Sequence, residues 1–359
     1  MSTDDHYMSR ALELAGQPAV TSPNPRVGAV VVRDGVVISE GTHVGAGSAH
    51  AEAVALTGVD AAGATLYVNL EPCTHEGRTP PCAPMVADSG IARIVVAMED
   101  PDPRVAGRGI ALLTERGIDV TVGVGAAEAT VLNAAYLHHR TTGRPLVTLK
   151  LALSLDGKLA AADGSSQWIT GEDSRLRVHA RRLESDAILI GAGTVLADDP
   201  SLTVRDVAAP RQPARVAIDA RGRIPATSRF FGPGETIVFT TIGCPHSVKT
   251  GWKEAGAEVL LVSQNAAGDT DLNEVLENLG GRGWLEVYCE GGARLATSLI
   301  AGDLVDRLEL YYGPLLLGGS GLGLGDIGLA GIDQAARWNP RTVERVGDDA
   351  LVIVEKAEL

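Results

Sequence analysis

The stretch from His50 to Cys82, HAEAVALTGVDAAGATLYVNLEPCTHEGRTPPC, constrains the first half of the chain more than any other. It places His50 and Glu52 at the start of a helix-like run and returns through the apolar segment ATLYVNL to a loop that carries Cys73 and Cys82. One imidazole and two thiolates are ligands that zinc prefers, and a site with only three protein ligands leaves a fourth position for water. The pattern predicts a catalytic zinc ion bound by His50, Cys73 and Cys82.

Glu52 is the predicted proton carrier of this site, because it lies two residues after His50. A zinc ion lowers the pKa of its bound water to roughly 7, and a nearby carboxylate can take up the released proton and pass it to a departing amine. A structural zinc would need a fourth protein ligand, and the available candidate is His75. Glu52 would serve no purpose in such a closed site, so the catalytic interpretation is favoured.

These motifs resemble those of zinc-dependent nucleoside and nucleobase deaminases, with His50-Ala51-Glu52 followed by Pro72-Cys73. The insert between Cys73 and Cys82 is longer than the C-x-x-C of most of that superfamily. It is similar to the insert of the bifunctional deaminase-reductases of riboflavin biosynthesis. SPNPRVGAVVV, GTHVGAGSAHAE and EDPDPRVAGRG match the deaminase half of that family, and KLALSLDGKLA, SQWIT, VLADDPSLTVR and EGGARLA match its reductase half. The resemblance covers nearly the whole chain.

Length and local pattern predict two α/β domains. A chain of 359 residues is long enough to form two domains, each with its own hydrophobic core. The segment HHRTTGRP at 138–145 marks the boundary, so we expect domains at 1–144 and 145–359. Strand-like and helix-like runs alternate in both halves. The resemblance implies a cytidine-deaminase-like α/β/α sandwich followed by a dihydrofolate-reductase-like α/β domain. Within the first domain, the pattern predicts a hairpin around Asp34-Gly35 and one helix over 126–140.

The resemblance also assigns substrate contacts in the first half. Local sequence alone leaves Asn24, between two prolines, as either a substrate contact or the capping residue of a rigid turn. A lone histidine such as His43 is more often structural than functional. The family pattern favours substrate binding by Asn24, His43, His75 and Arg78.

In the second half, two glycine turns follow strand-like segments and open helices, where free backbone N–H groups suit a pyrophosphate. Neither turn is a full G-x-G-x-x-G. The resemblance implies that NADPH binds here without that motif. The residues it assigns to the cofactor are Ala152, Trp168, Thr194, Asp198, Gly292, Ala293, Arg294, Leu295, Ala296, Thr297 and Ser298. Leu153 stands where the family commonly has a smaller residue, so its bulk is expected to alter cofactor fit.

Charged residues in this half have two interpretations each. A lysine in an apolar strand, such as Lys150, is usually exposed to solvent. Charged residues on a helix such as 172–186 usually form its solvent-exposed face. The resemblance instead makes Lys150 and Asp199 candidates for proton handling. It assigns the phosphorylated substrate to Ser166, Arg182, Leu202, Arg205 and Glu290. The glycine-rich segment 317–331 lacks the P-loop arrangement, so a phosphate loop, a lid and a simple surface loop remain open.

Charge and composition exclude several partners. The net charge of −14 repels polynucleotide phosphate and argues against nucleic acid. No apolar run is long enough for a membrane span and the N-terminus MSTDDHYMSR carries no signal peptide, so a cytoplasmic protein is expected, with Cys244 and Cys289 as reduced thiols. The family suggests a homo-oligomer, a dimer or a tetramer.

The predicted function has two steps. The resemblance implies zinc-dependent hydrolytic deamination of 2,5-diamino-6-(5-phosphoribosylamino)pyrimidin-4(3H)-one, followed by NADPH-dependent reduction of 5-amino-6-(5-phosphoribosylamino)uracil. Two alternatives remain: a deaminase of RNA or nucleosides with an unrelated second half, and a zinc-stabilised binding protein that is not an enzyme.

Overall fold

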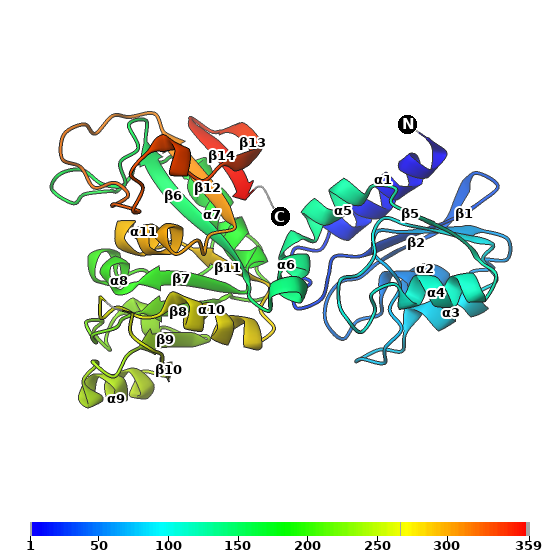
Figure 1. The fold of residues 1–359 in the computed structure, drawn as a ribbon, viewed down its shortest axis with the longest axis horizontal. Coiled ribbons are helices and arrows are strands. Elements are labelled where there is room, and N and C mark those ends of the chain that lie inside the picture. The colour runs from blue at the N-terminus through cyan, green and yellow to red at the C-terminus, as the bar shows by residue number, and fades with distance from the viewer. Residues whose placement is uncertain (1, 266, 357–359) are drawn as a thin grey trace. The chain divides into compact units, whose positions relative to one another are not determined.

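A computed structural model describes residues 2–265 and 267–356, and the chain divides into two compact units, Met1–Gly143 and Arg144–Leu359 (Figure 1). The division falls one residue before the boundary expected from the sequence. Each unit has its own sheet and its own buried core.

The first unit is built on a five-stranded sheet in the order β2-β1-β3-β4-β5. β1 is antiparallel to both of its neighbours, whereas β3, β4 and β5 are parallel. The predicted hairpin around Asp34-Gly35 joins β1 to β2, with both turn residues at positive φ. The strands are β1 Gly28–Arg33, β2 Val36–Thr42, β3 Thr65–Val68, β4 Arg93–Val96 and β5 Asp119–Val122.

Helices cover both faces of this sheet, which confirms the predicted α/β/α sandwich (Figure 1). α1 (Thr3–Gly16) packs on β1 and β3, and α5 (Ala126–Leu132) packs on α1. α2 (Ala51–Leu56) packs on β2 and β1 and contacts α3 (Cys82–Asp88), which in turn contacts α4 (Arg108–Glu115).

The single helix predicted over 126–140 is broken at Asn133, which separates α5 from α6 (Ala134–Thr142). The Asn133 side chain accepts a hydrogen bond from the Arg26 backbone N–H at 2.8 Å and donates one to the Arg26 carbonyl at 3.0 Å. These two bonds hold Asn133 at the break between the helices, and their partner lies too far along the chain for a local pattern to reveal it.

The second unit is built on a nine-stranded sheet in the order β10-β9-β8-β7-β11-β6-β12-β14-β13. In this spatial order, the first seven strands, β10 through β12, are parallel to one another. The hairpin of β13 and β14 forms the remaining edge, with β14 antiparallel to β12. The strands are β6 Leu146–Ser154, β7 Ala187–Gly191, β8 Ala214–Ile218, β9 Thr236–Thr240, β10 Glu258–Leu261, β11 Glu286–Cys289, β12 Arg307–Gly313, β13 Trp338–Val346 and β14 Asp349–Lys356.

Apolar clusters bury both faces of this larger sheet. Residues of α10 (Leu272–Gly281) and α11 (Ala293–Ala301) share one cluster with alternate residues of β6 and β11. On the other face, α8 (Ala192–Asp198) and α9 (His246–Glu254) pack against β7, β8 and β9, and α7 (Glu172–Glu184) packs against Tyr288 and Tyr311. Strand order reverses at β11, where a parallel sheet presents a ligand-binding crevice at the carboxyl ends of its strands.

Candidate active sites

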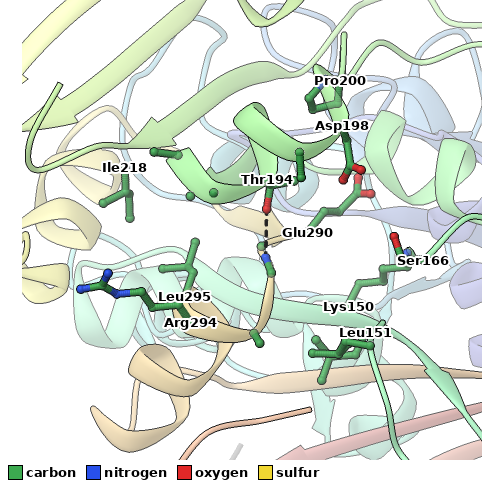
Figure 2. A pocket seen from close by; sticks show the side chains of 18 of the residues that line it. Lys150, Leu151, Ser166, Thr194, Asp198, Pro200, Ile218, Glu290, Arg294 and Leu295 are labelled. Atoms are coloured by element: carbon green, nitrogen blue, oxygen red, sulfur yellow. Dashed lines mark hydrogen bonds between the residues drawn. The ribbon is translucent and has the colours of Figure 1, made fainter. Parts of the chain in front are cut away.

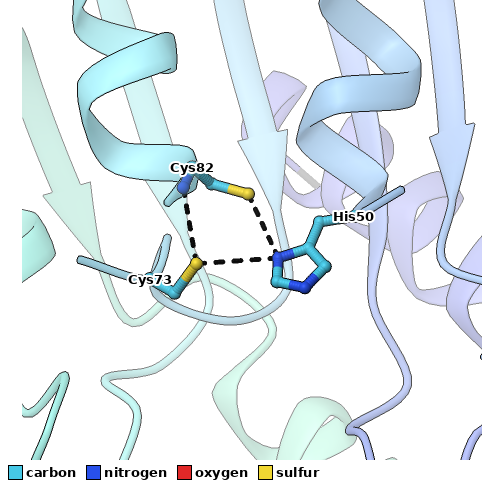
Figure 3. A group of neighbouring side chains, drawn as sticks. All are labelled: His50, Cys73 and Cys82. Atoms are coloured by element: carbon cyan, nitrogen blue, oxygen red, sulfur yellow. Dashed lines mark hydrogen bonds between the residues drawn. The ribbon is translucent and has the colours of Figure 1, made fainter. Parts of the chain in front are cut away.

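His50, Cys73 and Cys82 converge in the first unit, with all three possible ligand atoms within 4.8 Å of one another (Figure 3). His50 immediately precedes α2, Cys82 is the first residue of α3, and Cys73 lies in the loop that follows β3. The His50 Nδ1 atom lies 3.2 Å from the Cys82 Sγ and 3.6 Å from the Cys73 Sγ. The predicted ligand set therefore forms one cluster.

Two close backbone approaches position these ligands. A Cβ atom on Gly41 of β2 would lie 2.1 Å from the Ala51 carbonyl, so only glycine lets the first turn of α2, and His50 with it, sit against the strand. On the other side, a Cβ atom on Gly109 would lie 2.1 Å from the carbonyl of Pro72, the residue before Cys73.

Glu71 connects the loop that carries Cys73 to the segment 99–110, a role that sequence reasoning missed. Its buried carboxylate accepts hydrogen bonds from four backbone N–H groups, with distances of 3.2, 2.9, 2.7 and 3.1 Å to Asp100, Gly107, Gly109 and Ile110. The loop that carries Cys73 and the stretch EDPDPRVAGRG, which the sequence analysis noted only for its family resemblance, are thus joined through one side chain.

The chemistry of the cluster fits zinc. A hydrogen bond from Cys82 lowers the pKa of the Cys73 thiol to about 4, and His50 adds to this effect. The hydrogen bond with Cys73 and burial raise the pKa of Cys82, so one thiolate forms readily in this pair, and the thiolate is the form that binds a metal. The His50 Nε2 atom lies 3.2 Å from the Thr79 hydroxyl, which leaves Nδ1 toward the sulfurs. Among the described residues no fourth side chain joins the cluster, and His75 lies outside it.

Glu52 is buried at 4% exposure in the first turn of α2. Burial raises the pKa of its carboxyl group to about 7, and the nearby Cys73 sulfur adds to the increase. A carboxyl group with a pKa near neutrality can both accept and release a proton during turnover. Glu52 therefore has the position and the electrostatics expected of a proton carrier beside a three-ligand metal site.

The remaining predicted contacts of the first unit lie at different distances from this cluster. His43 is buried and its ring lies 5.3 Å from the His50 ring, and Asn24 contacts it through an amide nitrogen 2.9 Å from Nε2. The Nδ1 atom of His75 is buried without a hydrogen-bond partner among the described residues. Arg78 is exposed on the loop between the cysteines.

The second unit contains a pocket of about 820 Å³ at the carboxyl ends of its central strands (Figure 2). β6 contributes Lys150 and Ala152, β7 leads into Gly191–Thr194, β8 ends at Ile218, and β11 leads into Glu290–Leu295. The Thr194 hydroxyl accepts a hydrogen bond of 3.1 Å from the Gly292 N–H, which joins the two glycine turns. The predicted residues that line the pocket are Lys150, Ala152, Ser166, Trp168, Arg182, Thr194, Asp198, Leu202, Arg205, Glu290, Gly292, Ala293, Arg294, Leu295 and Ser298.

Three predicted residues do not line this pocket. Ala296 is fully buried in the core, and the Thr297 hydroxyl donates to the Ala293 carbonyl and accepts from the Gly325 N–H. The Asp199 carboxylate accepts from the Ser228 hydroxyl at 2.5 Å and the Arg229 N–H at 2.7 Å, and Asp199 is not among the lining residues. The geometry argues against proton transfer by Asp199, because its carboxylate is engaged in holding the turn at 228–229.

Leu153 also differs from expectation. It is buried in the core cluster and does not line the pocket, so its bulk does not reach the cofactor site as proposed. Successive side chains of a strand point to opposite faces of the sheet, so Lys150 and Ala152 lie on the opposite face of β6 from Leu153.

One end of the pocket contains a partly buried lysine and an acidic residue. Lys150, Ser166 and Glu290 lie on one side in Figure 2, and Ile218 and Arg294 lie on the other. Burial lowers the pKa of Lys150, while the carboxylate of Glu290 opposes that shift. Arg182 is held by Glu290, whereas Arg205 is exposed and has no ion pair among the described residues. Arg205 is therefore the cation at this end that is most available to an anionic ligand.

Sequence reasoning missed a second group of polar residues at the pocket. They follow the strands β8 and β10, whose carboxyl ends lie on the same edge of the sheet, and only the strand order could have revealed them. These residues are Arg221, Arg223, Arg229, Asn265 and Asp269, together with Arg175, which stacks on the exposed ring of Trp168 at 4.6 Å.

The glycine-rich segment 317–331 is anchored beside the pocket. The Asp156 carboxylate accepts from the N–H groups of Leu317 and Gly318, Leu322 pairs with Ala160, and Gly325 donates to Thr297. Leu322 also lines the pocket. No P-loop is formed, so the segment acts as a wall of this site.

Comparison with known proteins agrees with both sites. Residues 1–98 match the cytidine and deoxycytidylate deaminase zinc-binding region, and residues 145–352 match the RibD C-terminal domain. The chain is 41% identical to the riboflavin biosynthesis protein RibD of Aquifex aeolicus, over 98% of both chains. It is also 41% identical to RibD of Escherichia coli, over 96% of this chain and 97% of that protein.

The chain belongs to the RibD family. The structure of Acinetobacter baumannii RibD matches it with a TM-score of 0.90 at 36% identity, over 99% of both chains. A Thermotoga maritima structure, described as a diaminohydroxyphosphoribosylaminopyrimidine deaminase/5-amino-6-(5-phosphoribosylamino)uracil reductase, matches with a TM-score of 0.86 at 35% identity, over 99% of both chains.

Membership of the RibD family identifies a bifunctional enzyme of riboflavin biosynthesis with a zinc-dependent deaminase unit and an NADPH-dependent reductase unit. This membership excludes the two alternatives left open by the sequence, a deaminase with an unrelated second half and a zinc-stabilised binding protein that is not an enzyme. Within the described residues, no helix has the length and apolar character needed to cross a bilayer.

Proposed function

We propose that the first unit deaminates 2,5-diamino-6-(5-phosphoribosylamino)pyrimidin-4(3H)-one at the cluster of His50, Cys73 and Cys82. A zinc ion bound there supplies Lewis-acid activation of a water molecule. Glu52 takes up the proton released from that water and delivers it to the departing amine, a role supported by its burial and its pKa of about 7. Asn24, His43, His75 and Arg78 are the proposed substrate contacts on the surrounding loops.

The second unit, in this proposal, reduces the ribosyl group of the deaminated product, 5-amino-6-(5-phosphoribosylamino)uracil. NADPH supplies the hydride. The glycine turns at 191–194 and 291–295 present backbone N–H groups where a pyrophosphate can bind. The guanidinium of Arg205, which has no ion pair in the described part of the chain, is the proposed contact of the substrate phosphate. Lys150 is the proposed proton donor, because it is the only lysine among the pocket-lining residues and Asp199 does not line the pocket.

The single observation that carries the proposal is the presence of both sites in one chain, a three-ligand cluster beside a buried glutamate and a pocket at the strand ends. Mass analysis of the product from the phosphoribosyl diaminopyrimidine tests it. With zinc alone, the product should have exchanged an amino group for oxygen, and with NADPH added it should gain two hydrogen atoms. Glu52→Gln should abolish ammonia release while NADPH oxidation with the deaminated substrate continues, and retained ammonia release would remove Glu52 from the mechanism.

We further propose a cytoplasmic homo-oligomer, a dimer or tetramer, that does not bind nucleic acid. The net charge of −14 supports the last point, since electrostatic repulsion opposes binding to a polyanion. Light scattering of the purified protein would measure the oligomeric state directly.

A further inference from the structure

The segment 202–206, which carries Arg205 to the reductase pocket, has an unusual backbone at both of its ends. Leu202 and Asp206 have φ angles of 51° and 64°, in the left-handed region that residues with a Cβ atom seldom adopt. Between these two positions Val204 is buried, whereas Arg205 is exposed and lines the pocket. A backbone of this kind costs free energy, so it persists only where surrounding contacts hold it in place.

Side chains from outside the segment supply those contacts. Gln212, which lies shortly before β8, bonds to both backbone groups of Val204: its side-chain oxygen accepts from the N–H at 2.7 Å, and its side-chain nitrogen donates to the carbonyl at 3.3 Å. Arg182 of α7 donates to the carbonyl of Thr203 at 3.2 Å. The backbone is therefore fixed at the two residues that precede Arg205.

The backbone of Arg205 itself is held by His179, which also lies on α7. The N–H of Arg205 can only donate, so the His179 Nδ1 atom, 3.2 Å from that nitrogen, must accept the bond. A neutral ring then carries its hydrogen on Nε2, which lies 4.0 Å from the Asp206 carboxylate. The histidine is only 8% exposed, and neither it nor Gln212 is among the residues that line the pocket. Both side chains contact the backbone of the segment and not the ligand site.

We infer that His179 and Gln212 are positioning residues that hold the backbone of Arg205 so that its guanidinium meets the substrate phosphate. This inference rests on the proposed reductase function and adds two residues that do not touch the substrate. An arginine on a fixed backbone loses less conformational freedom when it binds an anion than one on a mobile loop. The phosphate is remote from the reacting carbon, so binding energy gained there can be used to lower the barrier of the reaction.

Discrimination between 5-amino-6-(5-phosphoribosylamino)uracil and its phosphate-free riboside tests this role. The measured quantity is the ratio of the two kcat/KM values for NADPH oxidation by the full-length protein. His179→Leu and Gln212→Met, which remove the hydrogen-bonding atoms, should each lower this ratio about threefold to tenfold, the range expected for a lost hydrogen bond. The KM for NADPH should not change, because the glycine turns that are proposed to bind the cofactor belong to other segments.

A matched variant separates positioning from a general structural role. His179→Asn places a side-chain oxygen as far from Cβ as Nδ1 is, so it can still accept from the Arg205 N–H and should keep most of the ratio. Equal ratios in His179→Asn and His179→Leu would overturn the inference. Gln212 is exposed, so Gln212→Met provides the same test if His179→Leu does not fold, and an unchanged ratio in that variant would count equally against the inference.

Combination with Arg205→Ala tests whether the two residues act through the arginine. Arg205→Ala should lower the ratio, and adding His179→Leu or Gln212→Met to it should cause no further loss, since a positioning residue has no effect once the residue it positions is gone. Losses that add in the double variants would contradict the inference.

Failure of the proposed function would give a different result. If the parent protein does not oxidise NADPH with the phosphorylated substrate, the reductase proposal and the inference fall together. If the parent protein does oxidise it and the variants keep the parent ratio, only the inference falls.

Discussion

Arg182 and Glu290 form a two-point ion pair inside the reductase pocket, with Nε and Nη2 of the guanidinium 2.5 and 2.9 Å from the two carboxylate oxygens. Their side chains are only 13% and 11% exposed, and a third donor of Arg182 reaches the Thr203 carbonyl at 3.2 Å. Most of the arginine's donors are therefore used within the protein.

We predict that Arg182→Ala destabilises the reductase unit by about 3–5 kcal/mol, because it leaves the buried Glu290 carboxylate without its partner. Urea unfolding of the full chain, followed by the transition of the second unit, measures this loss. Replacing both partners, in Arg182→Met with Glu290→Leu, should recover much of the stability. A single variant as stable as the parent would show that the pair is solvated.

Arg205 should behave differently, because it lines the same pocket without an ion pair among the described residues. We predict that Arg205→Ala raises the reductase KM for the phosphorylated substrate by about tenfold to a hundredfold, corresponding to one lost charge-assisted contact. Its unfolding free energy should change little. Arg337→Ala is the matched control, since Arg337 is exposed and outside the pocket. Similar KM values for Arg205→Ala and the control would remove Arg205 from the phosphate site.

The lowered pKa of Lys150, the proposed proton donor, predicts how the reductase rate depends on pH. Burial lowers its pKa from the usual value of 10.5, and a proton donor must be protonated to act. The rate should therefore fall as the pH rises through a pKa below 10.5. Lys150→Met should reduce kcat by about 10²-fold or more, and the residual rate should lose this decline, because methionine carries no ionisable proton. The measurement is the pH profile of NADPH oxidation, and a decline that persists unchanged in Lys150→Met would exclude Lys150 as the titrating group.

Removal of zinc should separate the two activities. Chelation is expected to abolish ammonia release and to spare NADPH oxidation with the deaminated substrate, because the lining of the reductase pocket comes wholly from residues 150–322. Cys73→Ser should lower zinc content and ammonia release together, and Cys244→Ser, a buried cysteine outside the cluster, should change neither. Loss of both activities on chelation would show that the metal stabilises the whole chain.

The sequence by itself determined the metal cluster of the first unit: it predicted that His50, Cys73 and Cys82 come together, and they do. These residues and Glu52, the proposed proton carrier, lie in short motifs whose residue types already indicate zinc chemistry. The alternation of strands and helices likewise determined the α/β class, because it depends on local patterns of burial.

Only the tertiary structure decided which way side chains face and which distant groups meet. Leu153 turns into the core while Lys150 faces the pocket, because the pairing of β6 between β11 and β12 sets the face that each residue occupies. Arg181 and Arg182 are adjacent on α7, yet one binds Glu286 and Glu309 and the other binds Glu290. Asn24 likewise contacts His43, nineteen residues away. Contacts of this kind arise from long-range strand order and packing, which no local spacing encodes.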